Sequence, residues 1–301
     1  MENSSELLIV MVLQFIANGL VIGSVYAVVA LGFSLIYHTT RVFHIAHGAI
    51  YTASAYLLYL LFVTLEVPLP LSILFALIGV VSLGILVEKA VYAPILTERQ
   101  SPLISFISSL GVFIVIVNLI ALLFGNETKI LLPGVEPTIS LGSVILARIQ
   151  IIQALTSILA VGSVFFFIRK NKLGHLIRAL ADNHQLLSVL GVKVSRVRRI
   201  VIGLGSGLAG LAGFLVALDV GIDPYIGMEV LLIAAVATII GGIGNYGGTI
   251  LGAVLLGVVQ NLVVWQASAR WQSAATFLIL LLILVVRPQG LFSRKIRVEE
   301  I

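Results

Sequence analysis

The sequence predicts an all-α polytopic membrane protein, a bundle of about 8–10 transmembrane helices with a short coupling helix on the cytoplasmic side. Hydrophobic residues make up 60% of the 301 residues and charged residues only 10%, whereas a soluble domain carries about 25% charged residues. Uncharged runs of roughly 18 residues or more recur along the chain, and each is long enough to cross a bilayer. One polar segment, 169–199, interrupts these runs. We expect a single membrane domain over residues 1–301.

The first apolar run, 10–37, is longer than the roughly 20 residues that one perpendicular helix needs. Gly19, Gly23 and Gly32 lie within it, so it forms either one tilted helix or two shorter segments. A polar joint follows at 38–47. Further spans are expected near 49–65, 71–93, 103–124, 150–168, 200–218, 227–243, 248–267 and 272–286.

The lysines and arginines predict the orientation of these spans. If 169–199 is cytoplasmic and the spans alternate, only Lys129, Arg148 and Arg270 of the 18 basic residues fall outside. Positive charge gathers in cytoplasmic loops, so we expect a cytoplasmic C-terminus in the plasma (inner) membrane. The side of the N-terminus depends on whether the first run crosses once or twice. The longest external connection, 125–149, is either a solvated linker or a docking surface for an external protein.

The polar segment 169–199 is rich in lysine and arginine and holds one acid, Asp182. Apolar residues recur at helical spacing between Gly174 and Gly191, which predicts a short helix. This helix is too short and too polar to cross a bilayer. It would lie on the cytoplasmic surface, offer a partial apolar stripe to a soluble partner, and receive mechanical work from outside this chain.

Two stretches, 205–210 and 242–247, match the dinucleotide pattern G-x-G-x-x-G. That pattern binds nucleotides only in a soluble βαβ unit, and both copies lie in or beside apolar runs. Small residues at 203–213 instead favour close helix packing. The dense cluster 241–252 indicates a break between helices, either a plain cytoplasmic turn or exposed backbone that meets a zwitterionic substrate.

Uncharged polar residues inside the spans either line a translocation path or join helices by hydrogen bonds. Asn118, Gln260 and Asn261 belong to this group. His44 and His47 share a helix face without an accompanying carboxylate, which favours a hydrogen-bonded joint over a metal site. The residues assigned to a translocation path are Asn18, Tyr26, His47, Tyr51, Gly242, Gly244 and Asn245.

The chain is not expected to be an enzyme. It has no P-loop, no H-E-x-x-H and no G-x-S-x-G, so any ATP that drives it is hydrolysed by another subunit. Acids are scarce inside the spans, which argues against a carrier coupled to protons or sodium. No cofactor or metal site is expected in this chain.

Five segments resemble, in order, the LivH-type permeases of branched-chain amino acid ABC importers: 19–56, 173–199, 203–213, 241–253 and 287–292. The resemblance implies a second related permease, either a paralogue or an identical copy. It also implies two cytoplasmic ATPase subunits that bind ATP and magnesium, and a periplasmic or lipid-anchored binding protein. The implied substrates are leucine, isoleucine and valine; urea, short amides or other amino acids are the alternatives within the family.

The resemblance assigns ATPase coupling to Gly174, Arg178, Ala179, Asp182, Asn183, Leu190 and Gly191. His44 stands where the family usually has asparagine, which leaves the exact substrate open. Leu186 and Leu187 replace an alanine pair, which points to a particular ATPase partner. Alternating access driven by that partner is the favoured mechanism. A stand-alone facilitator and a membrane scaffold are the alternatives, and neither needs a basic segment such as 169–199.

Overall fold

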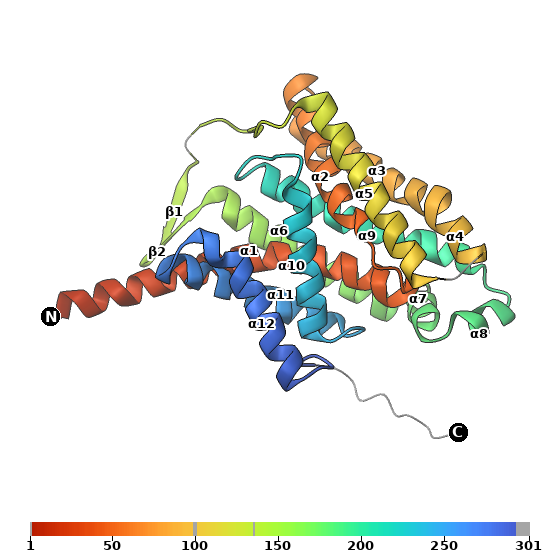
Figure 1. Ribbon diagram of the computed structural model, residues 1–301. Helices are drawn as coiled ribbons and strands as arrows, with labels where there is room; N and C mark the ends of the chain where they lie inside the picture. The colour runs from red at the N-terminus through yellow and green to blue at the C-terminus, as the bar shows by residue number, and fades with distance from the viewer. Residues whose placement is uncertain (1, 99–100, 135, 293–301) are drawn as a thin grey trace.

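The computed structural model describes residues 2–98, 101–134 and 136–292, which form a helical bundle with one two-stranded hairpin (Figure 1). Within these ranges, eight helices are long and apolar enough to cross a membrane, and a shorter apolar helix, α10 (Ile226–Gly241), lies among them. The predicted helical membrane bundle is confirmed. Its long helices are α1 (Glu2–Thr40), α2 (Ala46–Tyr59) with the π-helix η1 (Leu60–Thr64), α3 (Leu69–Val87) with the π-helix η2 (Glu88–Tyr92) and α4 (Ala93–Glu98), α5 (Pro102–Phe124), α6 (Arg148–Lys170), α9 (Val194–Ala217), α11 (Tyr246–Gln266), and η3 (Ala269–Trp271) with α12 (Gln272–Val286).

The first apolar run forms one unbroken helix, α1, which settles the choice between one segment and two. Its 39 residues extend over about 58 Å, roughly twice the hydrocarbon thickness. Gly19 and Gly23 do not break this helix. They lie where α1 packs closely against α11. A Cβ at these positions would lie 2.6 Å from the Cα of Val258 and 2.8 Å from the Cα of Val254.

The small residues of α9 allow three other helices to approach it closely, as their spacing predicted. A Cβ at Gly205 would lie 3.0 Å from the carbonyl oxygen of Gly32 on α1, and a Cβ at Gly213 would lie 2.6 Å from that of Tyr51 on α2. Gly207 is less crowded, since its nearest neighbour would be a methyl group of α3 at 3.4 Å. The tight contacts of α9 therefore lie on either side of Gly207.

The connection 125–149, which was expected on the outer side, contains regular structure within its described residues. It contains β1 (Thr138–Leu141) and β2 (Val144–Ala147), an antiparallel pair. The side-chain amide of Gln14 bonds both backbone groups of Ile145, at 2.8 Å each. Lys129 and Ile222 exchange two backbone hydrogen bonds of 2.8 and 2.9 Å. The segment is thus fixed to α1 and to the α9–α10 connection.

The polar segment was predicted as one helix, and that prediction is wrong. The structure has two helices, α7 (Lys172–Asp182) and α8 (His184–Val189). Asn183 separates them in an extended conformation, and its side-chain oxygen accepts a 2.9 Å hydrogen bond from the backbone N–H of Leu186. An asparagine that caps a helix start competes with continuation of the preceding helix.

Candidate coupling and translocation site

The predicted coupling segment and the glycine-rich turn meet at the same end of the bundle. Arg41, just after α1, donates a 3.3 Å hydrogen bond to the carbonyl oxygen of Ala181 on α7. His38 Nδ1 lies 3.4 Å from the hydroxyl of Tyr246, at the start of α11. The hairpin lies at the opposite end of α1 (Figure 1). The molecule therefore has a coupling end and a hairpin end.

The residues assigned to ATPase coupling gather on α7 and α8, at this coupling end. Gly174 is buried, and a Cβ there would lie 2.5 Å from the carbonyl oxygen of Phe167 at the end of α6. Gly191 has a φ of 81°, which favours glycine where the chain turns after α8. Ala179 is half-buried, and the remaining assigned residues are exposed: Arg178, Asp182, Asn183, Leu190 and Gly191.

α8 has an exposed apolar surface. Leu186, Val189 and Leu190 are 57%, 84% and 70% exposed. Leu187 points the other way and is buried in an apolar cluster with Ile177 of α7 and with residues of η2 and α9. The two adjacent leucines noted in the sequence therefore have different roles, since Leu187 anchors α8 and Leu186 belongs to the exposed surface.

A buried ion pair joins the start of α9 to the end of α3. Arg198 Nε donates to Glu88 Oε1, and their side chains are 11% and 1% exposed. Glu88 lies on the π-helix η2, a wide turn of a kind often found at functional sites. Sequence reasoning placed Arg198 in the polar segment 169–199 and did not pair it with Glu88. The available signal was an acid inside an apolar run, which requires a cationic partner.

A second polar cluster joins the start of α2 to η2, α5 and α1. His44 Nδ1 bonds the hydroxyl of Tyr92 at 2.7 Å, and this hydroxyl donates to Ser109 at 2.8 Å. Ser109 also accepts a 3.0 Å bond from the backbone N–H of Ala46. His47 bonds the carbonyl oxygen of Val29 on α1 at 3.2 Å. The hydrogen-bonded joint predicted from the two histidines is confirmed.

The residues assigned to a translocation path lie in separate places. Asn18 accepts a 3.1 Å bond from Gln14 near the hairpin end, whereas His47 and Tyr51 are fully buried in the core. Gly242 and Gly244 have φ values of 93° and 90° in the turn between α10 and α11. Asn245 caps α11 by accepting a bond from Gly248 and donates to the carbonyl oxygen of Phe292.

Tyr26 belongs to a hydrogen-bonded chain across three helices. Its hydroxyl donates to Gln260 Oε1 at 3.0 Å, and Gln260 Nε2 donates to Thr276 Oγ1 at 2.8 Å. Sequence reasoning selected Tyr26 and Gln260 separately and missed Thr276, because a single threonine in an apolar run carries no signal. Whether substrate meets any residue of the assigned path stays a prediction.

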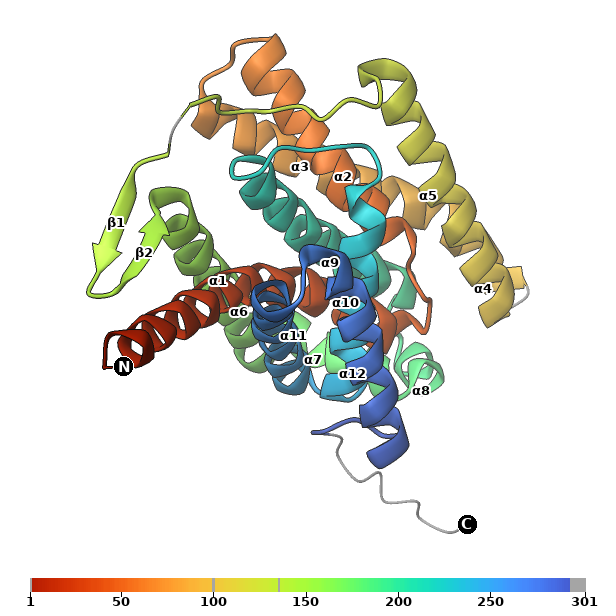
Figure 2. The same ribbon diagram turned by 60° about the vertical axis from the view of Figure 1, so that its left-hand side comes forward.

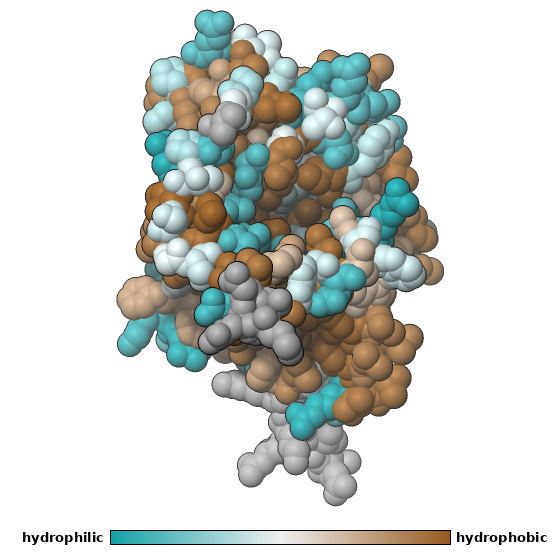
Figure 3. All heavy atoms as spheres, turned by 90° about the vertical axis from the view of Figure 1, so that its left-hand side faces the viewer, coloured by the Kyte–Doolittle hydropathy of each residue, from teal (hydrophilic) through white to brown (hydrophobic). Residues whose placement is uncertain are grey.

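At the hairpin end, Gln153 of α6 connects to the end of α9. Its amide donates to the carbonyl oxygen of Leu215 at 2.9 Å and to the carboxylate of Asp219 at 3.1 Å. Burial raises the pKa of Asp219, and the bond from Gln153 partly offsets that rise. Figure 3 looks on to this end, where polar side chains are interleaved with apolar ones across the upper half.

The profile of the family described as "Branched-chain amino acid transport system / permease component" matches residues 15–286. The chain belongs to this permease family. BraD, a high-affinity branched-chain amino acid transport system permease protein of Pseudomonas aeruginosa, is 29% identical to this permease over 296 residues. The alignment covers 94% of this chain and 96% of BraD. The LivH permease protein of Escherichia coli K12 is 28% identical over 297 residues, with the same coverage of 94% and 96%.

Among solved structures, PsaBC from Streptococcus pneumoniae in complex with Fab resembles this permease with a TM-score of 0.52. The sequence identity is 14%, and the superposition covers 92% of this chain and 93% of that one. This likeness concerns the fold alone. The resemblance to LivH-type permeases that the sequence motifs indicated is confirmed.

Proposed function

We propose that this permease carries branched-chain amino acids across the plasma membrane as one subunit of an ATP-driven importer. The transport names of BraD and LivH support the substrate class. The basic residues of 169–199 and of the C-terminal segment support a cytoplasmic coupling end, because positive charge gathers in cytoplasmic loops. With α1 as one unbroken helix, a cytoplasmic coupling end would leave the N-terminus and the hairpin on the outer side.

The exposed apolar surface of α8 is the observation that carries this proposal. It consists of Leu186, Val189 and Leu190 on a projecting helix. Its position at the coupling end suits a soluble ATPase subunit that binds ATP and magnesium and grips α8. Two such subunits would serve this permease and a second, related permease. A binding protein would deliver substrate at the hairpin end.

Movement of α8 would reach the bundle through α9. Leu187 couples α8 to α7 and α9 through a shared apolar cluster. The Glu88–Arg198 pair joins α9 to η2. The close contacts at Gly205 and Gly213 join α9 to α1 and α2. Displacement of α9 would therefore act on α1, α2 and η2 together, which suits a mechanism of alternating access. A stand-alone facilitator would have no use for this linkage.

Reconstituted transport tests the proposal. We expect vesicles with the whole complex to take up L-leucine only with ATP and the binding protein. A charge in the apolar surface, Val189→Asp, should detach the ATPase and abolish uptake. Gln185→Asp is the matched control, since it adds the same charge in the first turn of α8, outside that surface. Leucine uptake by the bare subunit without ATP, or full uptake by Val189→Asp, would contradict the proposal.

A further inference from the structure

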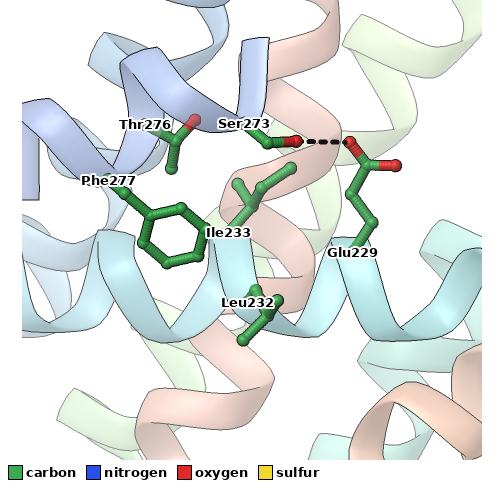
Figure 4. A pocket seen from close by; sticks show the side chains of 6 residues that line it. All are labelled: Glu229, Leu232, Ile233, Ser273, Thr276 and Phe277. Carbon is green, nitrogen blue, oxygen red and sulfur yellow. Dashed lines mark hydrogen bonds between the residues drawn. The ribbon is translucent and has the colours of Figure 1, made fainter. Parts of the chain in front are cut away.

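A shallow pocket lies between α10 and α12 (Figure 4). These two helices and α11 pack side by side (Figure 2). The pocket begins in the first turn of α10, directly after the α9–α10 connection that pairs with Lys129. It therefore opens in the half of the bundle nearer the hairpin end, where an imported solute would arrive. It is lined by Glu229, Leu232, Ile233, Ser273, Thr276 and Phe277.

The pocket combines one acid and two hydroxyls with apolar side chains. Glu229 and Ser273 face each other, and Ser273 Oγ lies 3.5 Å from Glu229 Oε1 (Figure 4). That distance is too long for a strong hydrogen bond to an ionised carboxylate. Within the described ranges, the ion pairs shorter than 4.0 Å are Lys129–Glu127 and Arg198–Glu88, so no basic side chain neutralises Glu229 there.

The size of the pocket restricts what Glu229 can receive. The space beside Glu229 is about 20 Å³ and open on one side, which leaves room for one group of about the size of a water molecule. An ammonium group has this size and supplies three donors. Leu232 and Phe277 remain exposed beside this space, so an aliphatic chain attached to the ammonium group could lie across them.

The Thr276 hydroxyl that lines the pocket is held by hydrogen bonds from inside the bundle. Thr276 Oγ1 accepts a bond from Gln260, which itself accepts one from Tyr26. Thr276 donates in turn to the carbonyl oxygen of Gln272, at 3.0 Å. This arrangement fixes the threonine rotamer and extends a polar edge from the pocket to α1, the central helix.

We infer that the Glu229 carboxylate and the Ser273 hydroxyl bind the α-ammonium group of the transported amino acid, and that Leu232 and Phe277 contact its aliphatic side chain. This inference rests on the proposed function and names a subsite for it. The carboxylate of the substrate turns away from Glu229 because like charges repel. Recognition through the ammonium group suits leucine, isoleucine and valine alike, since they share that group.

The test uses the purified complex without its binding protein and measures equilibrium binding of tritiated L-leucine. Two analogues separate the charged groups of leucine. We expect 3-methylbutylamine, which keeps the ammonium group, to displace leucine, and 4-methylpentanoate, which keeps the carboxylate, to fail. Glu229→Gln preserves the shape of the side chain and removes its charge, so leucine should bind roughly tenfold more weakly or worse. In this variant, 3-methylbutylamine should displace leucine no better than 4-methylpentanoate does.

Glu127→Gln is the matched control, because Glu127 is an exposed acid of the external connection outside the pocket; it should bind leucine as the wild type does. Glu229→Asp keeps the charge and should retain the preference for the amine.

If Glu229→Gln does not assemble, Ser273→Ala is measured instead and should weaken displacement by the amine several-fold. A preference for 4-methylpentanoate, an unchanged preference for the amine in these variants, or no leucine binding by a transporting complex would overturn the inference. Failure of the wild-type complex to take up leucine would instead refute the proposed function.

Discussion

Glu88 and Arg198, 110 residues apart in the sequence, form an ion pair that is almost closed to solvent. Removal of one partner leaves an uncompensated buried charge, which costs about 3–5 kcal/mol. We expect Arg198→Gln to lower the melting temperature of the complex and to reduce uptake more than ATPase binding. Thermal unfolding and vesicle uptake measure these effects.

The double variant Glu88→Gln with Arg198→Gln distinguishes the penalty of an unpaired buried charge from the loss of the ion pair itself. It removes both charges together, so it should be more stable than Arg198→Gln alone. Lys89→Gln is the neighbouring control, since Lys89 is exposed. Equal stability of Arg198→Gln and the double variant would show that the Glu88 charge costs nothing once Arg198 is removed, which would contradict the expected penalty.

The glycines of α9 differ in how much space surrounds them. A Cβ at Gly213 would lie 2.6 Å from a backbone carbonyl oxygen, so Gly213→Ala should force α2 and α9 apart and destabilise the bundle. A Cβ at Gly207 would meet only a methyl group at 3.4 Å, and Gly207→Ala should be neutral or slightly stabilising, because alanine favours helix by about 1 kcal/mol over glycine. Thermal melts and uptake of the two variants compare these effects; a larger loss at Gly207 would contradict the packing.

Asn183 controls the direction in which α8 leaves α7. Asn183→Ala removes the bond to Leu186 N, and loss of such a cap costs about 1 kcal/mol. We expect faster hydrogen exchange in α8 and weaker ATPase attachment, with leucine binding unchanged. Asn183→Asp keeps an acceptor and should behave like the wild type. If exchange in α8 is the same in Asn183→Ala, the cap does not hold the helix.

Asp219 predicts a pH dependence at the hairpin end. Burial raises its pKa in the folded protein, so the folded state binds more protons than the unfolded state between the ordinary carboxyl pKa and the raised one. Stability therefore falls as the pH rises through that window. Asp219→Asn removes this slope, while its side-chain oxygen can still accept from Gln153. Melting temperatures across the acidic range should converge at low pH and favour the asparagine variant at higher pH.

Apolar run length and small-residue spacing were sufficient to predict the helices and the close contacts of α9, because both depend on local patterns. The hairpin was not predicted, although Thr138 to Ala147 carries a β-branched pattern with a central glycine, Gly142, whose φ is 64°. The split between α7 and α8 was missed because Asn183 was treated as part of a continuous helix.

The remaining site features depend on tertiary contacts. The Glu88–Arg198 pair, the chain from Tyr26 through Gln260 to Thr276, and the approach of Ser273 to Glu229 each join segments far apart or on different helices. Local periodicity indicates which face of a helix is apolar, but it does not indicate which polar side chain will lie opposite.

α1 is hydrogen-bonded to other segments at two distant points, Gln14 in its first half and Arg41 directly after its last residue. Gln14 holds the hairpin, and Arg41 holds α7 just after the helix ends. A continuous helix resists shortening, so the distance between these two contact points is nearly fixed. A protein bound at the hairpin end and one bound at the coupling end would therefore be connected mechanically through this single helix.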